Sequence, residues 1–239
     1  FLGDRYPNRV LFLLQNNNEI RPTGGFIGSL GFIDINDGRI ENIQVRDVYD
    51  FDGQAFARKP NSEISLVAGQ DWGIRDSNTS PDFEISARQA KKFLEEAKGP
   101  GVDSVVAVDL EFVRAILEKT GPIEIEEYAL TLNAENFDIV LSYLIESKTF
   151  GKQSPKEILK YFLADLEKKI FETLDPLELV SIIADGVNEK HVQMYSDNET
   201  VQAWFKELGA AGHLSPIAPY NDYLNVIAVS VGGNKTDMF

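Results

Sequence analysis

The stretch from residue 21 to residue 29 holds residue types that suit an anion-binding loop. It reads Arg-Pro-Thr-Gly-Gly-Phe-Ile-Gly-Ser and leads into a predicted strand. Because glycine has no side chain, Gly24 and Gly25 let backbone amides approach a ligand closely, and Arg21 beside them can pair with a phosphate. A bulge at the start of the strand is the alternative interpretation of these glycines. The loop lacks the Lys-Ser/Thr end of a Walker motif, and no helix follows it as in a dinucleotide fingerprint.

A second stretch, residues 46–53, places three carboxylates beside an arginine at the end of a predicted strand. It reads Arg-Asp-Val-Tyr-Asp-Phe-Asp-Gly. Carboxylate oxygens are the ligands that magnesium prefers, and the bound metal can bridge to a phosphate. Asp47 and Asp50 are therefore candidate metal ligands, and Arg46 is a candidate phosphate ligand. A solvated acidic loop is the alternative interpretation, and the spacing does not fit an EF-hand.

A third stretch, residues 72–82, passes through Arg75 and Asp76 and ends at a predicted helix start. Free backbone N–H groups and the positive end of the helix dipole would face whatever Arg75 binds. Asp76 is a further candidate metal ligand. The alternative is that Ser80 or Asp82 only caps the helix, and the two interpretations are compatible.

The arginines are distributed unevenly along the chain. All of them lie in the first 114 positions, and the remaining residues use only lysine as a strong base. Arginine offers a planar fork that binds phosphate or carboxylate through two hydrogen bonds, which lysine cannot do. The asymmetry therefore indicates an oxyanion site in the N-terminal half. The alternative is that lysine covers the solvated faces of helices in the second half.

Charge and composition exclude several classes of function. The net charge of −15 disfavours binding to nucleic acid or to an anionic membrane surface, because both attract basic patches. There are no cysteines, so disulfides, thiolate nucleophiles and cysteine-ligated zinc are absent. The two histidines, His191 and His213, have no metal-ligand spacing, and we interpret them as surface or capping residues.

Apolar patterning predicts strands before the first helix. Residues 10–14 form a buried apolar run, and residues 25–35 and 39–45 flank an Asp-Gly turn that is typical of a hairpin. A helix over residues 81–97 ends at Gly-Pro-Gly. A strand at 102–108, a helix that Asp109 caps and that ends near residue 120, and a strand at 123–125 follow.

The second half is predicted to be mostly helical. Helix start signals, each with a capping residue three positions before a glutamate, lie at Ser154, Asp175 and Ser196, and another helix begins near Asn133. A last strand is predicted at residues 223–231. The segment 51–79 lacks periodicity, and loops of that length in a compact domain are usually either functional or disordered.

These elements predict one α/β domain over residues 1–239, with a three-layer α/β/α arrangement around a central mixed sheet. No segment approaches the roughly 18 consecutive apolar residues that a membrane-spanning helix needs. The chain begins at Phe1 without an initiator methionine, so we expect a segment upstream of it.

The order of the motifs resembles the bacterial domain family of unknown function numbered 4012. The motifs that carry this resemblance are NNNEIRPTGGFIGS, VRDVYDFDG, RDSNTSPDF, VDSVVAVDLEFVRAILEKTGPIEI, LNAENF and the terminal GGNKTD. The resemblance covers nearly the whole chain. It implies an extracytoplasmic domain at the cell envelope that an upstream membrane segment anchors.

More distantly, the layout is similar to that of LytR-CpsA-Psr (LCP) proteins. Those proteins transfer glycopolymers from a polyprenyl pyrophosphate carrier to the cell wall, using arginines and a magnesium-binding aspartate. Arg21, Arg46, Asp47 and the run 102–125 follow the corresponding order in this chain. The similarity implies an LCP-like fold and a magnesium-dependent phosphotransferase, in which Arg46 and Asp47 are catalytic.

The leading hypothesis is a domain that binds a phosphorylated or pyrophosphorylated glycan or polyprenyl carrier. The expected phosphate ligands are Arg21, Arg46, Arg75, Gly24 and Gly25, and the expected magnesium ligands are Asp47, Asp50 and Asp76.

The alternative hypothesis is a non-catalytic surface module that recognises a glycan or a protein. Its contact surface would be the aromatic residues Phe51, Phe56 and Trp72 of the long loop, and its arginines would form structural ion pairs.

Overall fold

The computed structural model describes residues 3, 7–53, 65, 71–147, 157–214, 224 and 226–230. Contacts divide the chain into two compact units. The larger unit comprises residues 1–109 and 190–239, and the smaller unit comprises residues 110–189. The single domain over residues 1–239 stays a prediction.

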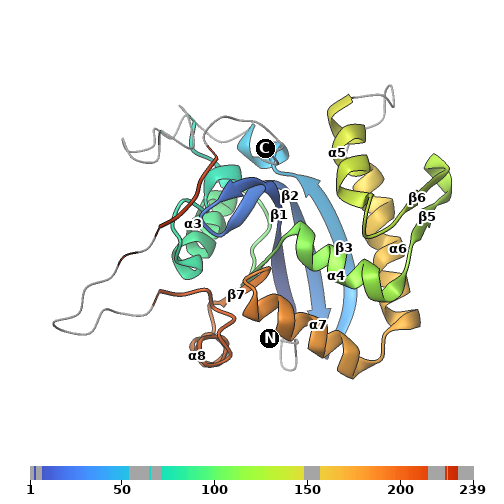
Figure 1. Ribbon diagram of the computed structural model, residues 1–239. Coiled ribbons are helices and arrows are strands. Elements are labelled where there is room, and N and C mark those ends of the chain that lie inside the picture. Colours follow the sequence, from blue (N-terminus) through green and yellow to red (C-terminus); the bar gives the residue numbers. More distant parts are fainter. Residues whose placement is uncertain are drawn as a thin grey trace. The chain divides into compact units, whose positions relative to one another are not determined.

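A five-stranded sheet forms the centre of the larger unit. Its strands, in spatial order, are β3 (Arg39–Asp47), β2 (Gly24–Asn36), β1 (Asn8–Arg21), β4 (Ser104–Val108) and β7 (Val192–Ser196). Strands β1 and β4 are parallel, whereas the other neighbours are antiparallel. Figure 1 shows β1, β2 and β3 as long neighbouring strands. The prediction of an α/β fold with a central mixed sheet is therefore confirmed.

The hairpin of β2 and β3 has the turn that its sequence predicts. Asp37 and Gly38 adopt positive φ angles of 47° and 72°. A type I′ turn needs positive φ at both central positions, and Asp-Gly supplies it at low cost. The strand predicted at residues 10–14 is longer than expected, because β1 continues through the polar residues that follow it.

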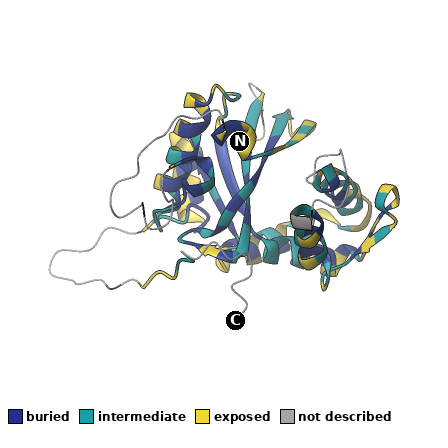
Figure 2. Ribbon diagram, turned by 90° about the horizontal axis from the view of Figure 1, so that it is seen from above, coloured by how far each residue is buried: buried dark blue, intermediate teal, exposed yellow. Residues whose placement is uncertain are grey.

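Helices and short turns pack on this sheet to complete the core of the larger unit. Helix α3 (Phe83–Glu96) contacts β4 and β7, and helix α8 (Glu199–Glu207) contacts β7. Asp82 caps α3 by accepting a hydrogen bond from the backbone N–H of Ile85. The helix predicted over 81–97 is therefore confirmed. Figure 2 shows that the central strands are mostly buried, whereas the helices alternate between buried and exposed residues.

The smaller unit is mainly helical, as predicted. Asp175 and Glu178 form a capping box at the start of α7, which confirms one of the three predicted start signals. The start predicted at Ser154 lies outside the described residues. The elements of this unit are α4 (Leu110–Thr120), β5 (Ile123–Ile125), η2 (Glu126–Tyr128), β6 (Leu130–Leu132), α5 (Phe137–Ser147), α6 (Glu157–Thr173) and α7 (Pro176–Asn188).

Three sequence predictions about local structure are wrong. Asn198, not Ser196, caps α8, because its side chain accepts from the N–H groups of Thr200 and Val201. Strand β7 lies in a region that was predicted to be helical. The described residues 224 and 226–230 form no strand, although residues 223–231 are nearly all apolar.

Candidate functional site

The candidate site begins at a bulge near the end of β1. Asn16 pairs with Phe26 of β2, but the next pair along is Ile20 with Gly25. Residues 17–19 of β1 are therefore extra residues without an opposite partner on β2. Glu19, at the end of this bulge, is only 4% exposed.

Two adjacent glycines make room for this bulge. A Cβ atom on Gly25 would lie 2.2 Å from the backbone of Asn16, which is closer than any real contact. Gly24 has a φ of +133°, and a Cβ there would lie 2.4 Å from the Gln15 side chain. The two glycines thus allow the close strand contact at the bulge, which agrees with the alternative interpretation of the sequence. Their role as phosphate ligands stays a prediction.

Arg21 follows the bulge, and its side chain is only 5% exposed. One guanidinium nitrogen, Nη2, lies 2.7 Å from Oε1 of Glu19, and the other, Nη1, donates to the Ser230 carbonyl at 2.6 Å. The guanidinium also lies over the Phe26 ring, 5.6 Å from its centroid. Within the part of the chain that the structure describes, Nε of Arg21 is buried without a hydrogen-bond partner.

A short 3-10 helix, η1 (Ile74–Asp76), supplies the second arginine of the site. Asp52, at the end of α1 (Tyr49–Asp52), accepts hydrogen bonds from the backbone N–H groups of Ile74 at 2.6 Å and Arg75 at 3.2 Å. Nη1 of Arg75 also lies 3.3 Å from Oδ2 of Asp52. Because the Asp52 side chain is 1% exposed, this carboxylate fixes the position of η1 from inside the protein.

Asp76 joins the two arginines. Its Oδ2 lies 3.2 Å from Nε of Arg75, and its Oδ1 lies 3.8 Å from Nη2 of Arg21. Burial raises the pKa of the Asp76 carboxyl to about 6, and the nearby Arg75 and Arg21 only partly offset that effect. Glu19, Arg21, Asp52, Arg75 and Asp76 together are called the buried ion-pair network below.

Neutral polar side chains continue the network along the same end of the sheet. Asn78 is fully buried and donates to Oγ1 of Thr23 at 3.1 Å and to the Gly25 carbonyl at 2.9 Å. Gln193 of β7 donates to the Thr23 carbonyl at 2.7 Å. Among the described residues, Oδ1 of Asn78 and Oγ of Ser77 are buried without a partner. Buried polar atoms usually have partners, so these atoms mark a polar site rather than a sealed core.

Sequence reasoning did not identify Asn78 or Gln193 as part of the site. The only available signal for Asn78 was its place in the third polar stretch, two positions after Asp76. Gln193 carried no signal, because it lies in a strand that the sequence did not predict.

The third predicted arginine lies outside the network. Nε of Arg46 lies 2.8 Å from Oδ2 of Asp50, and both side chains are more than 40% exposed. The guanidinium of Arg46 lies over the Phe51 ring, and that of Arg75 lies over the Tyr49 ring, at 5.3 and 5.6 Å. The two arginines thus stack on aromatic residues of the same short helix, α1. The structure brings Arg21 and Arg75 to one carboxylate but gives Arg46 a different, exposed one.

Each predicted metal ligand has a partner within the protein. Asp47 accepts a hydrogen bond from the backbone N–H of Tyr49 at 3.0 Å, Asp50 pairs with Arg46, and Asp76 pairs with Arg75. In the described ranges, no group of three or more carboxylates or histidines is arranged to hold a metal ion. Magnesium can be held by one or two carboxylates together with a substrate phosphate, so the roles of Asp47, Asp50 and Asp76 as its ligands stay predictions. The catalytic roles of Arg46 and Asp47 also stay predictions.

Of the aromatic residues in the alternative hypothesis, Phe51 is buried and Trp72 is partly buried. Phe51 is 6% exposed and belongs to the hydrophobic core. Trp72 packs edge-on against Phe93 of α3, and its Nε1 donates to the Asp76 carbonyl at 2.9 Å. Phe56 lies outside the described residues. Phe51 and Trp72 thus stabilise the fold around η1. Buried Phe51 does not offer a contact surface, whereas a recognition role for the partly buried Trp72 stays a prediction.

One histidine has a carboxylate partner that the sequence did not indicate. Nδ1 of His191 lies 2.8 Å from Oδ2 of Asp109, and the Asp109 side chain is 5% exposed. The two residues come from the ends of the neighbouring strands β4 and β7. This contact replaces the interpretation of His191 as a surface or capping residue.

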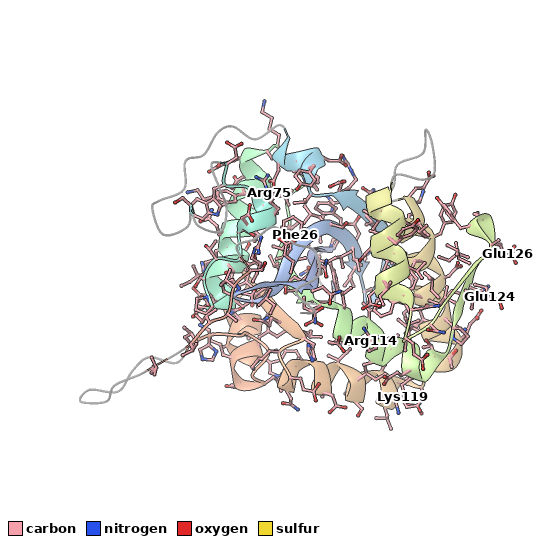
Figure 3. All side chains as sticks on the ribbon, turned by 45° about the horizontal axis from the view of Figure 1, so that its top comes forward. Phe26, Arg75, Arg114, Lys119, Glu124 and Glu126 are labelled. Atoms are coloured by element: carbon pink, nitrogen blue, oxygen red, sulfur yellow. The ribbon has the colours of Figure 1, made fainter. Side chains whose placement is uncertain are left out.

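Arg21 connects Phe26 and Arg75, which are both labelled in Figure 3. Its guanidinium lies over the Phe26 ring, and the Asp76 carboxylate lies between it and Arg75. Phe26 comes from the start of β2, Arg21 from the end of β1 and Arg75 from η1. The site is therefore built where the β1–β2 connection meets η1.

Comparisons with known proteins identify the family and the fold. The family model described as a protein of unknown function (DUF4012) matches residues 6–143, more than half of the chain. A comparison with curated proteins found no match. Among the described residues, no helix has the length and apolar character needed to cross a membrane.

The chain is similar to several solved structures at low sequence identity. The protein gbs0355 from Streptococcus agalactiae is 14% identical, with a TM-score of 0.54 over 86% of this chain and 74% of that one. Lin1025 from Listeria innocua is 12% identical, with a TM-score of 0.46 over 86% and 79%. TagV from Bacillus subtilis is 11% identical, with a TM-score of 0.44 over 86% and 79%. The gbs0355 structure, whose score exceeds 0.5, shows that the chain shares the mixed α/β fold of that protein.

Proposed function

The chain belongs to the DUF4012 family, and we propose that it is an envelope-exposed domain that binds the phosphate or pyrophosphate of a glycan or polyprenyl carrier. The resemblance of its motifs to those of LCP proteins supports a role connected with cell-wall glycopolymers. The ligand phosphate binds at Arg21 and Arg75.

One observation carries this proposal. Arg21 and Arg75 lie far apart in the sequence, yet their guanidinium groups reach the two oxygens of the same carboxylate, that of Asp76. A phosphate group presents oxygens at comparable separations, and guanidinium forks bind carboxylate and phosphate in the same geometry. Asp76 thus marks a position where two arginines can hold an oxyanion.

The unsatisfied atoms beside the arginines support a polar ligand at this position. Nε of Arg21 can donate a hydrogen bond to a phosphate oxygen, and Oγ of Ser77 can donate or accept one. Oδ1 of Asn78 can accept a hydrogen bond from a hydroxyl group or from water. A phosphorylated glycan offers both acceptors and donors, so it can satisfy all three atoms.

The further step that we propose is transfer of the phosphorylated glycan from a polyprenyl pyrophosphate to a hydroxyl group of an envelope acceptor. The hydroxyl oxygen forms a new bond to the glycan-linked phosphorus and loses its proton to solvent, the pyrophosphate P–O bond breaks, and polyprenyl monophosphate leaves. In such a transfer the arginines stabilise the charge that develops on the phosphate oxygens. Magnesium would supply additional charge neutralisation when bound, and Asp47, Asp50 and Asp76 are the carboxylates that would hold it. No step of the proposal depends on the metal.

A second candidate function is a non-catalytic surface module that recognises a glycan or a protein. The observation that favours it is the pairing of each arginine in the network with carboxylates: Arg21 with Glu19, and Arg75 with Asp52. In that case the network is a structural set of ion pairs, and replacing an arginine lowers stability without affecting a ligand.

Binding of farnesyl phosphate, measured by isothermal titration calorimetry with and without magnesium, tests the proposal. The variant is Arg75→Lys, which keeps the positive charge but removes the planar fork. Loss of one of two bidentate contacts is expected to weaken binding about tenfold or more.

The matched control is Arg88→Ala, since Arg88 is an exposed arginine of α3 that pairs with Glu84. We expect its affinity for farnesyl phosphate to equal that of the wild type. Absence of binding by the wild-type protein in both conditions would remove the proposal. Equal affinities of the wild type and Arg75→Lys, with a lower melting temperature for the variant, would favour the second candidate.

A further inference from the structure

Helix α7, orange in Figure 1, has apolar side chains on two of its faces. Its inner face packs against α4, since Ile182 is 7% exposed and belongs to the same hydrophobic cluster as Ile116 and Leu117. Val187, five positions after Ile182, is equally buried. The contribution of α7 to the core of the smaller unit therefore comes from this inner face.

The outer face of α7 carries a line of exposed apolar residues. Leu177 is 80% exposed, Val180 is 61% exposed, and Ala184 is exposed as well. Their spacing of three and four positions places them on one face of the helix, and they are called the apolar stripe below. Single exposed apolar side chains are ordinary on protein surfaces, whereas a line of them on a helix is typical of a surface that binds another helix.

Carboxylates run beside the apolar stripe. Glu178 and Asp185 are both exposed and lie seven positions apart, which corresponds to about two helical turns. They therefore form a second line along α7, next to the apolar one. Helix α7 and its flanking residues, Asp175 and Glu189, contain no lysine or arginine. This side of the helix is thus apolar along one line and negative along its neighbour.

We propose that the apolar stripe of α7 is a docking surface for an amphipathic helix of a partner protein, and that lysine or arginine flanks the apolar face of that helix. The apolar side chains of the partner pack against Leu177, Val180 and Ala184, and its basic side chains pair with Glu178 and Asp185. Two-stranded coiled coils divide the roles of central and flanking positions in the same way. This interaction is separate from phosphate binding.

The charge beside the stripe selects this partner over two other occupants. A second copy of the chain would bring two acidic lines into one interface, and like charges across an interface cost affinity. An anionic membrane surface is repelled for the same reason, and the net charge of −15 adds to that repulsion. A basic helix is attracted instead, because its charges are complementary to Glu178 and Asp185.

Two stapled helical peptides are the probes in the experiment that tests this proposal. They share one leucine stripe and differ only in the residues beside it, which are lysine in one peptide and glutamate in the other. Fluorescence anisotropy gives the Kd of each labelled peptide for the full chain. The stripe variant combines Leu177→Ser with Val180→Ser. The matched control is Ile85→Ser, which removes a 57% exposed apolar side chain from α3 of the larger unit.

We expect the wild type and Ile85→Ser to bind the lysine peptide with equal affinity. The stripe variant should bind it about tenfold or more weakly, because two apolar side chains are removed from the interface. Its melting temperature should stay within about 3 °C of the wild-type value, since both replaced side chains are exposed. The glutamate peptide should bind the wild type more weakly than the lysine peptide, and the difference should shrink at high salt.

A charge variant provides a second test that leaves the apolar stripe intact. It combines Glu178→Gln with Asp185→Asn. Glutamine can still accept the hydrogen bond that Glu178 accepts from the backbone N–H of Asp175 in the capping box. This variant should bind the two peptides with nearly equal affinity.

Equal affinities of the wild type and the stripe variant for the lysine peptide would overturn the docking surface, as would absence of binding by the wild type. A melting temperature of the stripe variant that is lower by about 10 °C would show that the chain itself covers the stripe. A dimer seen by sedimentation and abolished in the stripe variant would assign this face to a second copy. Binding to vesicles of phosphatidylcholine and phosphatidylglycerol that the stripe variant loses would assign it to a membrane, and each of these results would remove the partner helix.

Discussion

Arg21 donates a 2.6 Å hydrogen bond to the carbonyl oxygen of Ser230, a residue 209 positions later in the chain. The backbone N–H of Ser230 in turn donates to the carbonyl of Ile20 at 3.0 Å. These two contacts attach the C-terminal segment to the end of β1, next to the buried ion-pair network. Both contacts use backbone atoms of Ser230, so the identity of its side chain matters little.

Ser230→Pro should lower the free energy of unfolding by about 1 kcal/mol, because proline removes the N–H that bonds Ile20. Ser230→Ala keeps both backbone contacts and should change it by less than about 0.5 kcal/mol. Urea unfolding followed by circular dichroism measures both values. Equal stabilities of the two variants would show that the N–H contact contributes nothing.

Replacement of Arg21 should destabilise the protein strongly. Glu19 and Arg21 are each 5% exposed, so Arg21→Met leaves a buried carboxylate without its main partner. We expect a loss of about 3–5 kcal/mol. The double variant with Glu19→Gln should lose clearly less than the sum of the single variants, since it removes both charges together. A double-mutant cycle by urea unfolding measures the coupling, and additive losses would contradict the pairing.

Gly25→Ala should lower the stability of the protein much more than an alanine at a glycine that has free space around its Cα. Its Cβ would lie 2.2 Å from the Asn16 backbone, so β1 and β2 must separate at the bulge, at a cost of about 2–3 kcal/mol. Gly101 has no atom within 4 Å of the position of a Cβ, which makes Gly101→Ala the matched control. Thermal unfolding compares the two variants, and similar melting temperatures would refute the close approach of the strands.

Asp76 should make the protein less stable as the pH rises from about 4 to about 6. Its pKa is raised from 3.8 to about 6 on folding, so the folded state binds more protons in that interval. The protonated Asp76 contributes to the free energy of unfolding, and this contribution is fully present below the pKa of the unfolded state. It is lost as the pH rises past the pKa of the folded state, and the loss amounts to about 3 kcal/mol. Asp76→Asn should lack this loss and gain stability over the wild type above pH 6.

Asp34→Asn provides the control of opposite sign. The hydrogen bond from Arg9 lowers the pKa of Asp34, so ionised Asp34 stabilises the folded state at neutral pH, and this contribution disappears as the pH falls. The variant should therefore be less stable than the wild type at pH 8 and approach it in acid. Urea unfolding at several pH values measures both variants, and a pH-independent difference for Asp76→Asn would contradict its raised pKa.

Local patterns predicted the elements that depend on near neighbours. Asp37 and Gly38 predicted the hairpin turn, and the Asp175 and Glu178 pair predicted the capping box of α7, because each structure involves only a few consecutive residues. The choice of Ser196 as the cap of α8 failed for a related reason. Asn198, two positions later, offers an equivalent oxygen, and the local sequence does not decide between them.

The sequence alone determined the α/β class, the order of most elements and the polar stretches that contain Arg21, Arg75 and Asp76, since these follow from patterns of side-chain type along the chain. Only the tertiary structure decided which charges meet. It joined Arg21 to Arg75 through Asp76, separated Arg46 from them, buried Phe51 in the core and packed the partly buried Trp72 against it. The physical reason is that the energy of an ion pair depends on the distance between its charges in space. Here those distances are set by the bulge in β1 and by the hydrogen bonds that Asp52 accepts from η1, and both involve residues that are remote in sequence.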